Sequence, residues 1–250
     1  MPVDLLVFGP HPDDIEIGLG GTVARQAADG IRVGLCDLTA GEMGSNGTVE
    51  ERLAEGEAAR LVLGAVWRHN LRWPDRRIGS DPAHIEEAAS FIRRHRPRTV
   101  AIPYWADRHP DHVAASELLT EAAFNAGLRR YAPSTEAWKP EWLCYYFIND
   151  SAEPSFVVDV SAQYDQKRAA LDCHASQFQA PLDGATVATR LNTPLFRQLI
   201  ESRDAQFGAR AGVRWAEGFV VREPVLRGGL MRGGLPQGPS SERSRGPRGD

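Results

Sequence analysis

Short apolar runs alternate with helix-favouring segments along the first two-thirds of this 250-residue chain. Alternation of this kind is typical of a parallel β-sheet whose connecting helices cover both of its faces. The apolar runs are short and carry few polar residues, as expected of strands that are buried on both sides. The expected strands span residues 5–8, 31–38, 66–71, 99–103, 142–148 and 155–160.

Helix-favouring composition and helix-breaking residues define the segments between these strands. Ala, Leu and Glu dominate residues 50–63, Pro97 ends one expected helix and Gly127 closes another. The run from Gly18 to Gly21 is expected to open the first helix. The expected helices span residues 18–29, 50–63, 85–96, 111–126, 161–174 and 193–207. The fold class that follows is α/β, with a mostly parallel sheet and helices on both faces.

The chain is long enough to bury a large core, and one domain is the simplest expectation for its length. From about Arg227 onward, Gly, Pro, Ser and Arg dominate and apolar residues nearly vanish. A segment of this composition cannot bury enough apolar surface to offset its loss of chain entropy. We therefore expect a single domain over residues 1–224 and a flexible tail over residues 225–250.

Charge, cysteine content and hydropathy argue against several classes of protein. A net charge of −4 is not that of a nucleic-acid-binding or membrane-surface protein. Three cysteines, an odd number without a C-x-x-C pair, argue against a disulfide framework. The first residues lack the basic start and apolar core of a signal peptide, and no run of about 20 apolar residues predicts a membrane span. The expected location is the cytoplasm.

Two short segments carry most of the chemistry that the chain offers. His11-Pro12-Asp13-Asp14 follows the first expected strand, and His109-Pro110-Asp111-His112 follows the fourth. Ligands of parallel α/β sheets bind beyond the carboxyl ends of the strands, so we expect both segments at the same edge. Their nitrogen and oxygen donors suffice for one open zinc site with an acid/base group beside it.

A catalytic zinc ion usually has three protein ligands and one water molecule, and His11, Asp14 and His112 fit that set. Residues three apart at the start of a helix or in a tight turn can face the same point. Pro12 and Pro110 restrict the backbone of the two segments. We therefore expect these two imidazoles and one carboxylate to share one cation.

The remaining members of the two segments are candidates for the chemistry itself. Asp13 could take a proton from the attacking water, and His109 could donate a hydrogen bond to the oxyanion. Asp111 could orient one of the histidines, as carboxylates next to metal ligands commonly do. The alternative is that His-Pro-Asp forms only a turn, in which an aspartate caps the helix that follows.

The chain resembles the zinc-dependent N-acetylglucosaminyl deacetylases of the PIG-L/LmbE-like superfamily. Their fingerprint is a strand followed by an A-H-P-D-D-E-like segment, with H-P-D-H downstream. Here residues 9–16 read Gly-Pro-His-Pro-Asp-Asp-Ile-Glu, so Pro10 replaces the usual small residue. The resemblance covers about residues 3–224. Residues 39–44, 46–48, 74–76, 176–178 and 218–219 are similar to the bacillithiol-biosynthesis branch.

This resemblance implies a Rossmann-like fold, one Zn²⁺ per chain (another divalent metal could serve in the cell), a small amino-sugar substrate and a homo-oligomer. It implies hydrolysis of the N-acetyl group of an N-acetylglucosamine conjugate, with N-acetylglucosaminyl malate in bacillithiol biosynthesis as the best candidate. It also implies the roles already given to the five key residues. These are His11, Asp14 and His112 as ligands, Asp13 as general base and His109 as the group that stabilises the tetrahedral intermediate.

Substrate contacts are expected from the polar loop after the second strand and from two arginines. Arg52 matches a family arginine that holds the substrate, and a guanidinium suits an anionic aglycone. Arg108, next to His109, could assist. Glu42, Ser45 and Asn46 could donate or accept hydrogen bonds with sugar hydroxyls, or could only shape the loop.

Several rival functions fit parts of the sequence. A dinucleotide-binding oxidoreductase needs G-x-G-x-x-G directly after the first strand, where this chain has His-Pro-Asp-Asp. Gly18, Gly20 and Gly21 come later, and Asp37 could mimic the ribose-binding acid. A two-metal phosphoesterase would need more carboxylates. A deacylase of another amino-sugar conjugate, or a non-catalytic sugar-binding or metal-binding protein on the same scaffold, are the remaining alternatives.

Overall fold

The computed structural model describes residues 1–79, 81–132, 134–179 and 187–226. Residues Met1–Val220 form one compact unit, and the chain from Val221 onward forms a second. Most of the tail expected over residues 225–250 lies outside the described residues. Among the described residues, no helix is long and apolar enough to cross a membrane.

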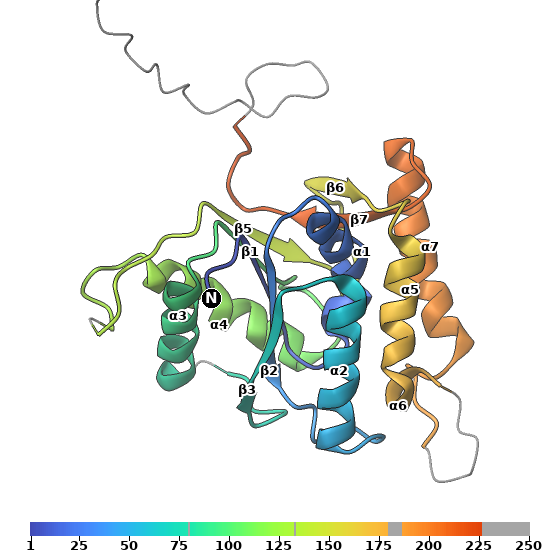
Figure 1. The fold of residues 1–250 in the computed structure, drawn as a ribbon, viewed down its shortest axis with the longest axis horizontal. Coiled ribbons are helices and arrows are strands. Elements are labelled where there is room, and N and C mark those ends of the chain that lie inside the picture. The colour runs from blue at the N-terminus through green and yellow to red at the C-terminus, as the bar shows by residue number, and fades with distance from the viewer. Residues whose placement is uncertain (80, 133, 180–186, 227–250) are drawn as a thin grey trace, which may run out of the picture. The chain divides into compact units, whose positions relative to one another are not determined.

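The described part of the compact unit contains a seven-stranded sheet with the order β3-β2-β1-β4-β5-β7-β6 (Figure 1). Neighbours from β3 to β5 are parallel, whereas β7 is antiparallel to both β5 and β6. The expected α/β class with a mostly parallel sheet is confirmed. The strands are β1 Leu5–Gly9, β2 Val33–Thr39, β3 Trp67–Trp73, β4 Thr99–Pro103, β5 Trp142–Tyr146, β6 Phe156–Asp159 and β7 Ala216–Val220.

Helices cover both faces of the sheet (Figure 1). On one face, α3 and α4 pack against each other and bury apolar side chains such as Phe8, Ile92 and Leu119. On the other face, α1, α2 and α5 contact one another. The helices are α1 Asp14–Ala28, α2 Val49–Leu63, α3 Pro82–His95, α4 Pro110–Ala126, α5 Tyr164–Cys173, α6 Ala175–Phe178 and α7 Pro194–Ala211.

The strand order reverses between β1 and β4. From β1 the chain continues to β2 and β3 on one side, and from β4 it continues to β5 on the other. The connections after these two strands therefore diverge and leave a crevice at their carboxyl ends. Both His-Pro-Asp segments begin at this crevice.

Strand β7 was not expected from the sequence, and it lies between β5 and β6. Its residues do not form an apolar run, because Glu217 and Gly218 stand at its centre. Both residues are nevertheless buried. A Cβ atom on Gly218 would lie 2.7 Å from the Phe207 ring, so only glycine allows α7 to approach this strand so closely.

The first helix also differs from expectation, because α1 begins at Asp14 and not at Gly18. The glycines lie inside this helix, where Leu19 departs from helical geometry with φ −146°. A Cβ atom on Gly18 would lie 2.3 Å from Tyr146 Cδ2. This glycine therefore permits close packing of α1 on the end of β5, and the helix starts immediately after the first His-Pro-Asp segment.

Candidate metal centre and catalytic site

Both His-Pro-Asp segments line a cleft of about 470 Å³ at the crevice between β1 and β4. Asp14 is the first residue of α1, and His109 is the N-cap of α4. The loops after β2 and β3, Arg52 of α2, residues 148–149 and residues 189–191 also contribute to the wall. This volume lies in the range of small-molecule sites in proteins.

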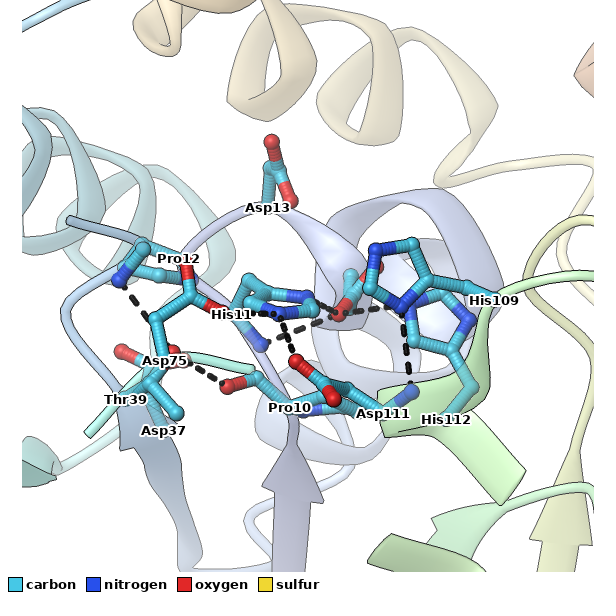
Figure 2. A network of polar contacts seen from close by, with 12 residues as sticks. Pro10, His11, Pro12, Asp13, Asp37, Thr39, Asp75, His109, Asp111 and His112 are labelled. Carbon is cyan, nitrogen blue, oxygen red and sulfur yellow. Dashed lines mark hydrogen bonds and ion pairs between the residues drawn. The ribbon is translucent and has the colours of Figure 1, made fainter. Parts of the chain in front are cut away.

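The structure brings the three expected metal ligands together. One oxygen of Asp14, Oδ2, lies 3.0 Å from His11 Nδ1 and 3.3 Å from His112 Nε2. The two imidazoles come from opposite sides of the crevice, as Figure 2 shows for His11 and His112. Ligands of one tetrahedral zinc ion, with bonds of about 2.0–2.1 Å, lie about 3.4 Å apart. Both separations from Asp14 Oδ2 are close to this spacing, and the donor types are ones that zinc accepts.

The site holds more possible donors than this trio. Ring nitrogens of His11, His109 and His112 lie within 4.8 Å of one another, as do donor atoms of His11, Asp75 and Asp111. Nδ1 of His109, however, accepts a hydrogen bond from the Asp111 backbone N–H at 3.2 Å. A neutral His109 therefore carries its proton on Nε2 and can act as a donor.

Carboxylates contact the outer nitrogens of both expected imidazole ligands. His11 Nε2 lies 3.2 Å from Asp75 Oδ1 and 3.4 Å from Asp111 Oδ2 (Figure 2). His112 Nδ1 lies 3.1 Å from Asp107 Oδ1. Such partners fix the orientation and tautomer of metal-binding histidines. This arrangement supports an orienting role for Asp111.

The same carboxylates determine the electrostatics of the site. Burial alone would lower the pKa of His112, but Asp14 and Asp107 outweigh it and raise that pKa to about 9. Burial is likewise outweighed at His11, where Asp111, Asp14 and Asp75 raise the pKa well above its usual value. A field that favours a proton on each imidazole also favours a divalent cation between them.

Asp13 lies beside this trio with its side chain buried. Its backbone has φ 127°, which residues with a Cβ atom rarely adopt, and its side chain makes no capping hydrogen bond. Burial raises the pKa of Asp13 to about 6, although Arg52 opposes the shift. Asp13 therefore lines the cleft with a raised pKa and does not act as a helix cap.

Arg52 reaches the cleft, but both terminal nitrogens of its guanidinium contact oxygen atoms of the protein. Nη1 donates to the Gly41 carbonyl at 2.8 Å, and Nη2 donates to the Pro12 carbonyl at 2.9 Å and lies 3.3 Å from Asp13 Oδ2. Its side chain is 5% exposed. These contacts favour a role in holding Asp13 and the loop after β2 over direct recognition of an aglycone.

His109 lies beside both expected imidazole ligands. Its ring centroid is 4.9 Å from that of His11 and 4.7 Å from that of His112. Burial, followed by the nearby His112 and His11, lowers the pKa of His109. A neutral imidazole with its proton on Nε2 is suited to donate a hydrogen bond to an oxyanion.

The remaining expected substrate contacts divide into two groups. Ser45 and Arg108 line the cleft, whereas Glu42 and Asn46 are not part of its wall. Glu42 Oε1 accepts from the Asp75 backbone N–H at 2.6 Å. The Asn46 side-chain amide pairs with the backbone of Val187 at 2.8 and 2.9 Å. These last two side chains hold loops together.

Four residues of the site were not expected from the sequence. Asp75 and Asp107 contact the imidazoles, and Arg76 and Arg190 line the cleft. Arg76 Nη1 lies 2.9 Å from Asp111 Oδ1. Asp75 and Arg76 do lie in a stretch that resembles the family, residues 74–76, which was the available signal. Asp107 stands two residues before His109. Nothing in the spacing of the sequence pointed to Arg190.

The acid and the glycines that suggested a dinucleotide site serve other purposes. Asp37 accepts hydrogen bonds from Nε and Nη2 of Arg68, at 2.7 and 2.8 Å, and both side chains are buried. The glycines lie inside α1 and not in a loop before it. No phosphate-binding turn of that kind follows β1, where His11 stands instead.

Known proteins resemble this chain in sequence and in structure. Residues 6–123 match the family model PIG-L, described as GlcNAc-PI de-N-acetylase. Diacetylchitobiose deacetylase of Thermococcus kodakarensis is 31% identical over 230 residues, which cover 86% of this chain and 81% of the relative. The 1D-myo-inositol 2-acetamido-2-deoxy-alpha-D-glucopyranoside deacetylase of Rhodococcus jostii is 26% identical, with 90% and 98% covered. The conserved protein TT1542 of Thermus thermophilus is 42% identical with a TM-score of 0.82, covering 92% of this chain and 100% of that one.

Proposed function

The chain belongs to the PIG-L/LmbE-like family of deacetylases, and on this premise we propose that it hydrolyses the N-acetyl group of N-acetylglucosamine conjugates with one zinc ion. The observation that carries the proposal is the position of Asp14 Oδ2, in contact with both His11 and His112. Asp13 and His109 stand beside this trio, as an acid/base group and an oxyanion donor must.

His11, Asp14 and His112 would hold the zinc ion. When bound, it would supply polarisation of the acetyl carbonyl and a water molecule of lowered pKa. Asp13 accepts the proton of the attacking water, while His109 Nε2 donates a hydrogen bond to the oxygen that gains negative charge. The C–N bond then breaks, and the departing amine takes a proton from Asp13 or His109.

The substrate's aglycone is the group attached to N-acetylglucosamine. The names of the relatives do not point to the malate that we expected from the sequence. By their names, the two curated relatives act on diacetylchitobiose and on an inositol conjugate, and neither points specifically to the bacillithiol branch. We nevertheless propose an anionic aglycone, with N-acetylglucosaminyl malate as the leading candidate. Support comes from Arg76, Arg108 and Arg190, which line the cleft together.

The deacetylase proposal is tested by acetate release from purified, zinc-loaded protein. The substrates are N-acetylglucosamine, diacetylchitobiose, the inositol conjugate and N-acetylglucosaminyl malate. We expect acetate from at least one conjugate, one equivalent of zinc per chain, and loss of both in His112→Ala. Two equivalents of metal would favour the phosphoesterase alternative, and metal binding without acetate from any substrate would favour the non-catalytic one.

The aglycone proposal is tested with Arg108→Met, because among the described residues its guanidinium has no ion-pair or hydrogen-bond partner. Loss of a charged hydrogen bond should raise KM for the malate conjugate about tenfold and leave KM for N-acetylglucosamine nearly unchanged. Arg77→Met is the control, since Arg77 is exposed and is not part of the cleft wall. Equal changes in both KM values would contradict an anionic aglycone.

The resemblance also implies a homo-oligomer, which stays a proposal. The cytoplasmic location expected from the sequence stays a prediction. Light scattering of the purified protein gives its mass in solution. A mass of one chain would contradict the homo-oligomer.

A further inference from the structure

Helix α1 is interrupted shortly after it leaves the proposed metal centre. Leu19 has φ −146°, and the amides of Gly21 and Thr22, two and three residues further on, donate to the Glu217 carboxylate at 3.0 and 2.6 Å. A carboxylate in this position serves the second half of the helix as a capping group would. On the other side of the break, the Ile17 carbonyl accepts from Arg203 Nη2 at 2.7 Å.

The two side chains at this break belong to a buried four-charge cluster of Lys167, Arg203, Asp204 and Glu217. Lys167 Nζ lies 2.7 Å from Asp204 Oδ2 and 2.6 Å from Glu217 Oε1, and Arg203 Nε donates to Asp204 at 3.0 Å. Two positive charges thus balance two negative ones. Buried ion pairs of this kind contribute little net stability compared with apolar packing, so their geometry is the more informative property.

Arg203 donates to backbone carbonyls in two segments that lie next to the proposed metal centre. Nη2 reaches Ile17, which lies in the same first part of α1 as Asp14. Nη1 donates to the carbonyls of Phe147 and Ile148, at 3.1 and 2.8 Å, just after the end of β5. Ile17 and Ile148 both line the cleft.

A short chain of contacts leads from Ile148 to the second half of the centre. The next residue, Asn149, donates to Asp107 through its backbone N–H at 2.9 Å and its side-chain amide at 3.0 Å. Asp107 in turn lies 3.1 Å from His112 Nδ1. Arg203 is therefore connected to Asp14 on one side and to His112 on the other.

We propose that Arg203 is a positioning residue that fixes the separation of Asp14 and His112, by holding the start of α1 against the segment after β5. It touches neither substrate nor metal and acts through Ile17 and Ile148. The inference rests on the proposed function, because it takes Asp14 and His112 as ligands of one cation. It requires no acetyl transfer, and it can therefore be tested by metal binding alone.

The test compares Arg203→Met and Arg203→Lys with the same two substitutions at Arg93. Arg93 is a matched control, because it is also buried and donates to backbone carbonyls, those of Ala126, Leu128 and Tyr131, outside the cleft wall. Three quantities are measured on each purified protein: the melting temperature, zinc affinity by competition with a chromogenic chelator, and the visible spectrum of the cobalt-substituted form.

All four variants are expected to melt below the wild type. Only Arg203→Met should also weaken zinc binding, by about 10- to 100-fold as for other groups that orient ligands, and change the cobalt spectrum. Arg203→Lys should lie between it and the wild type, and it carries the test alone if the methionine variant does not fold. Zinc affinity and cobalt spectrum equal to those of the wild type would overturn the proposal, whatever the melting temperature.

Failure of the two proposals can be told apart. Weakened zinc binding in Arg203→Met, in a protein that releases no acetate from any conjugate, would support the positioning role and contradict the deacetylase activity. Normal zinc binding in Arg203→Met, in a protein that releases acetate, would contradict the positioning role and support the deacetylase activity.

Discussion

At the scale of single residues, the site depends on the different protonation behaviour of two neighbouring aspartates. Asp13 and Asp14 are adjacent and both buried, yet their surroundings move their pKa values in opposite directions. Burial raises the pKa of Asp13 to about 6. For Asp14, burial is outweighed by His112 and His11, which hold its pKa well below the usual value. One carboxylate can therefore exchange a proton while the other stays ionised as a ligand.

Replacing Asp13 by Asn should separate these two roles. Asn tolerates positive φ better than most residues, so the fold should persist, and the proposed ligands are untouched. Acetate release should fall by about 10²- to 10⁴-fold because the proton acceptor is lost, with zinc content as in the wild type. Asp165→Asn, at a side chain that is 95% exposed, is the control. Near-normal turnover would remove Asp13 from the mechanism.

The spacing of residues predicted the trio but not the groups around it. His11 and Asp14, like His109 and His112, are three apart, and each pair follows a parallel strand, so a pattern within a few residues was enough. Asp75 reaches His11 from the loop after β3. Its position depends on the register of β3 against β2, which no local pattern encodes.

At the scale of elements, α1 is held to the sheet by a buried ion network. Arg68 of β3 binds Asp37 of β2 through two hydrogen bonds and Glu16 of α1 at 2.6 Å. Burial would raise the pKa of Glu16, but Arg68 and His174 outweigh it and lower the pKa to about 2. The network therefore connects the helix that bears Asp13 and Asp14 to two strands.

This pKa predicts how acid affects stability. The folded pKa of Glu16 is about 2 against an ordinary value of 4.5, so its ionised form stabilises the fold above pH 4.5. That contribution, about 3 kcal/mol, is lost as the pH falls from 4.5 towards 2. In urea unfolding, the difference in free energy between wild type and Glu16→Gln should be largest at pH 7 and shrink over this range. Glu50→Gln, at an exposed glutamate, is the control; a difference independent of pH would contradict the assignment.

Strand β7 shows why some elements could not be predicted from the sequence. A glutamate at the centre of a buried strand is unfavourable unless it is paired. Here Lys167 from α5 and two amides of α1 satisfy Glu217. These partners come from parts of the chain that are distant in sequence, so Glu217 reads locally as a loop residue.

At the scale of the whole molecule, the reversal of strand order joins segments about a hundred residues apart. Alternation of strands and helices predicted the parallel sheet, and the ends of β1 and β4 predicted where the motifs would meet. The antiparallel end of the sheet and the contacts of α7 depend on tertiary packing. Those are the parts on which the position of Arg203 depends.

Composition predicts that residues 227–250 contribute nothing to the core or the site. A chain that ends at Leu226 should therefore keep the melting temperature, zinc content and acetate release of the full chain. The control is a chain that ends at Trp215, which lacks β7 together with Glu217 and should not fold. A lower melting temperature after removal of residues 227–250 alone would contradict the expected domain boundary.

The strained backbone of Asp13 lowers the stability of the fold, although the side chain at this position is needed for the proposed catalysis. An L-residue held at φ 127° costs about 1–3 kcal/mol, and glycine would remove that cost together with the carboxylate. Laboratory evolution that selects only for survival at high temperature should therefore enrich inactive sequences with glycine at position 13. A screen for robust variants of this enzyme would have to score turnover in every round.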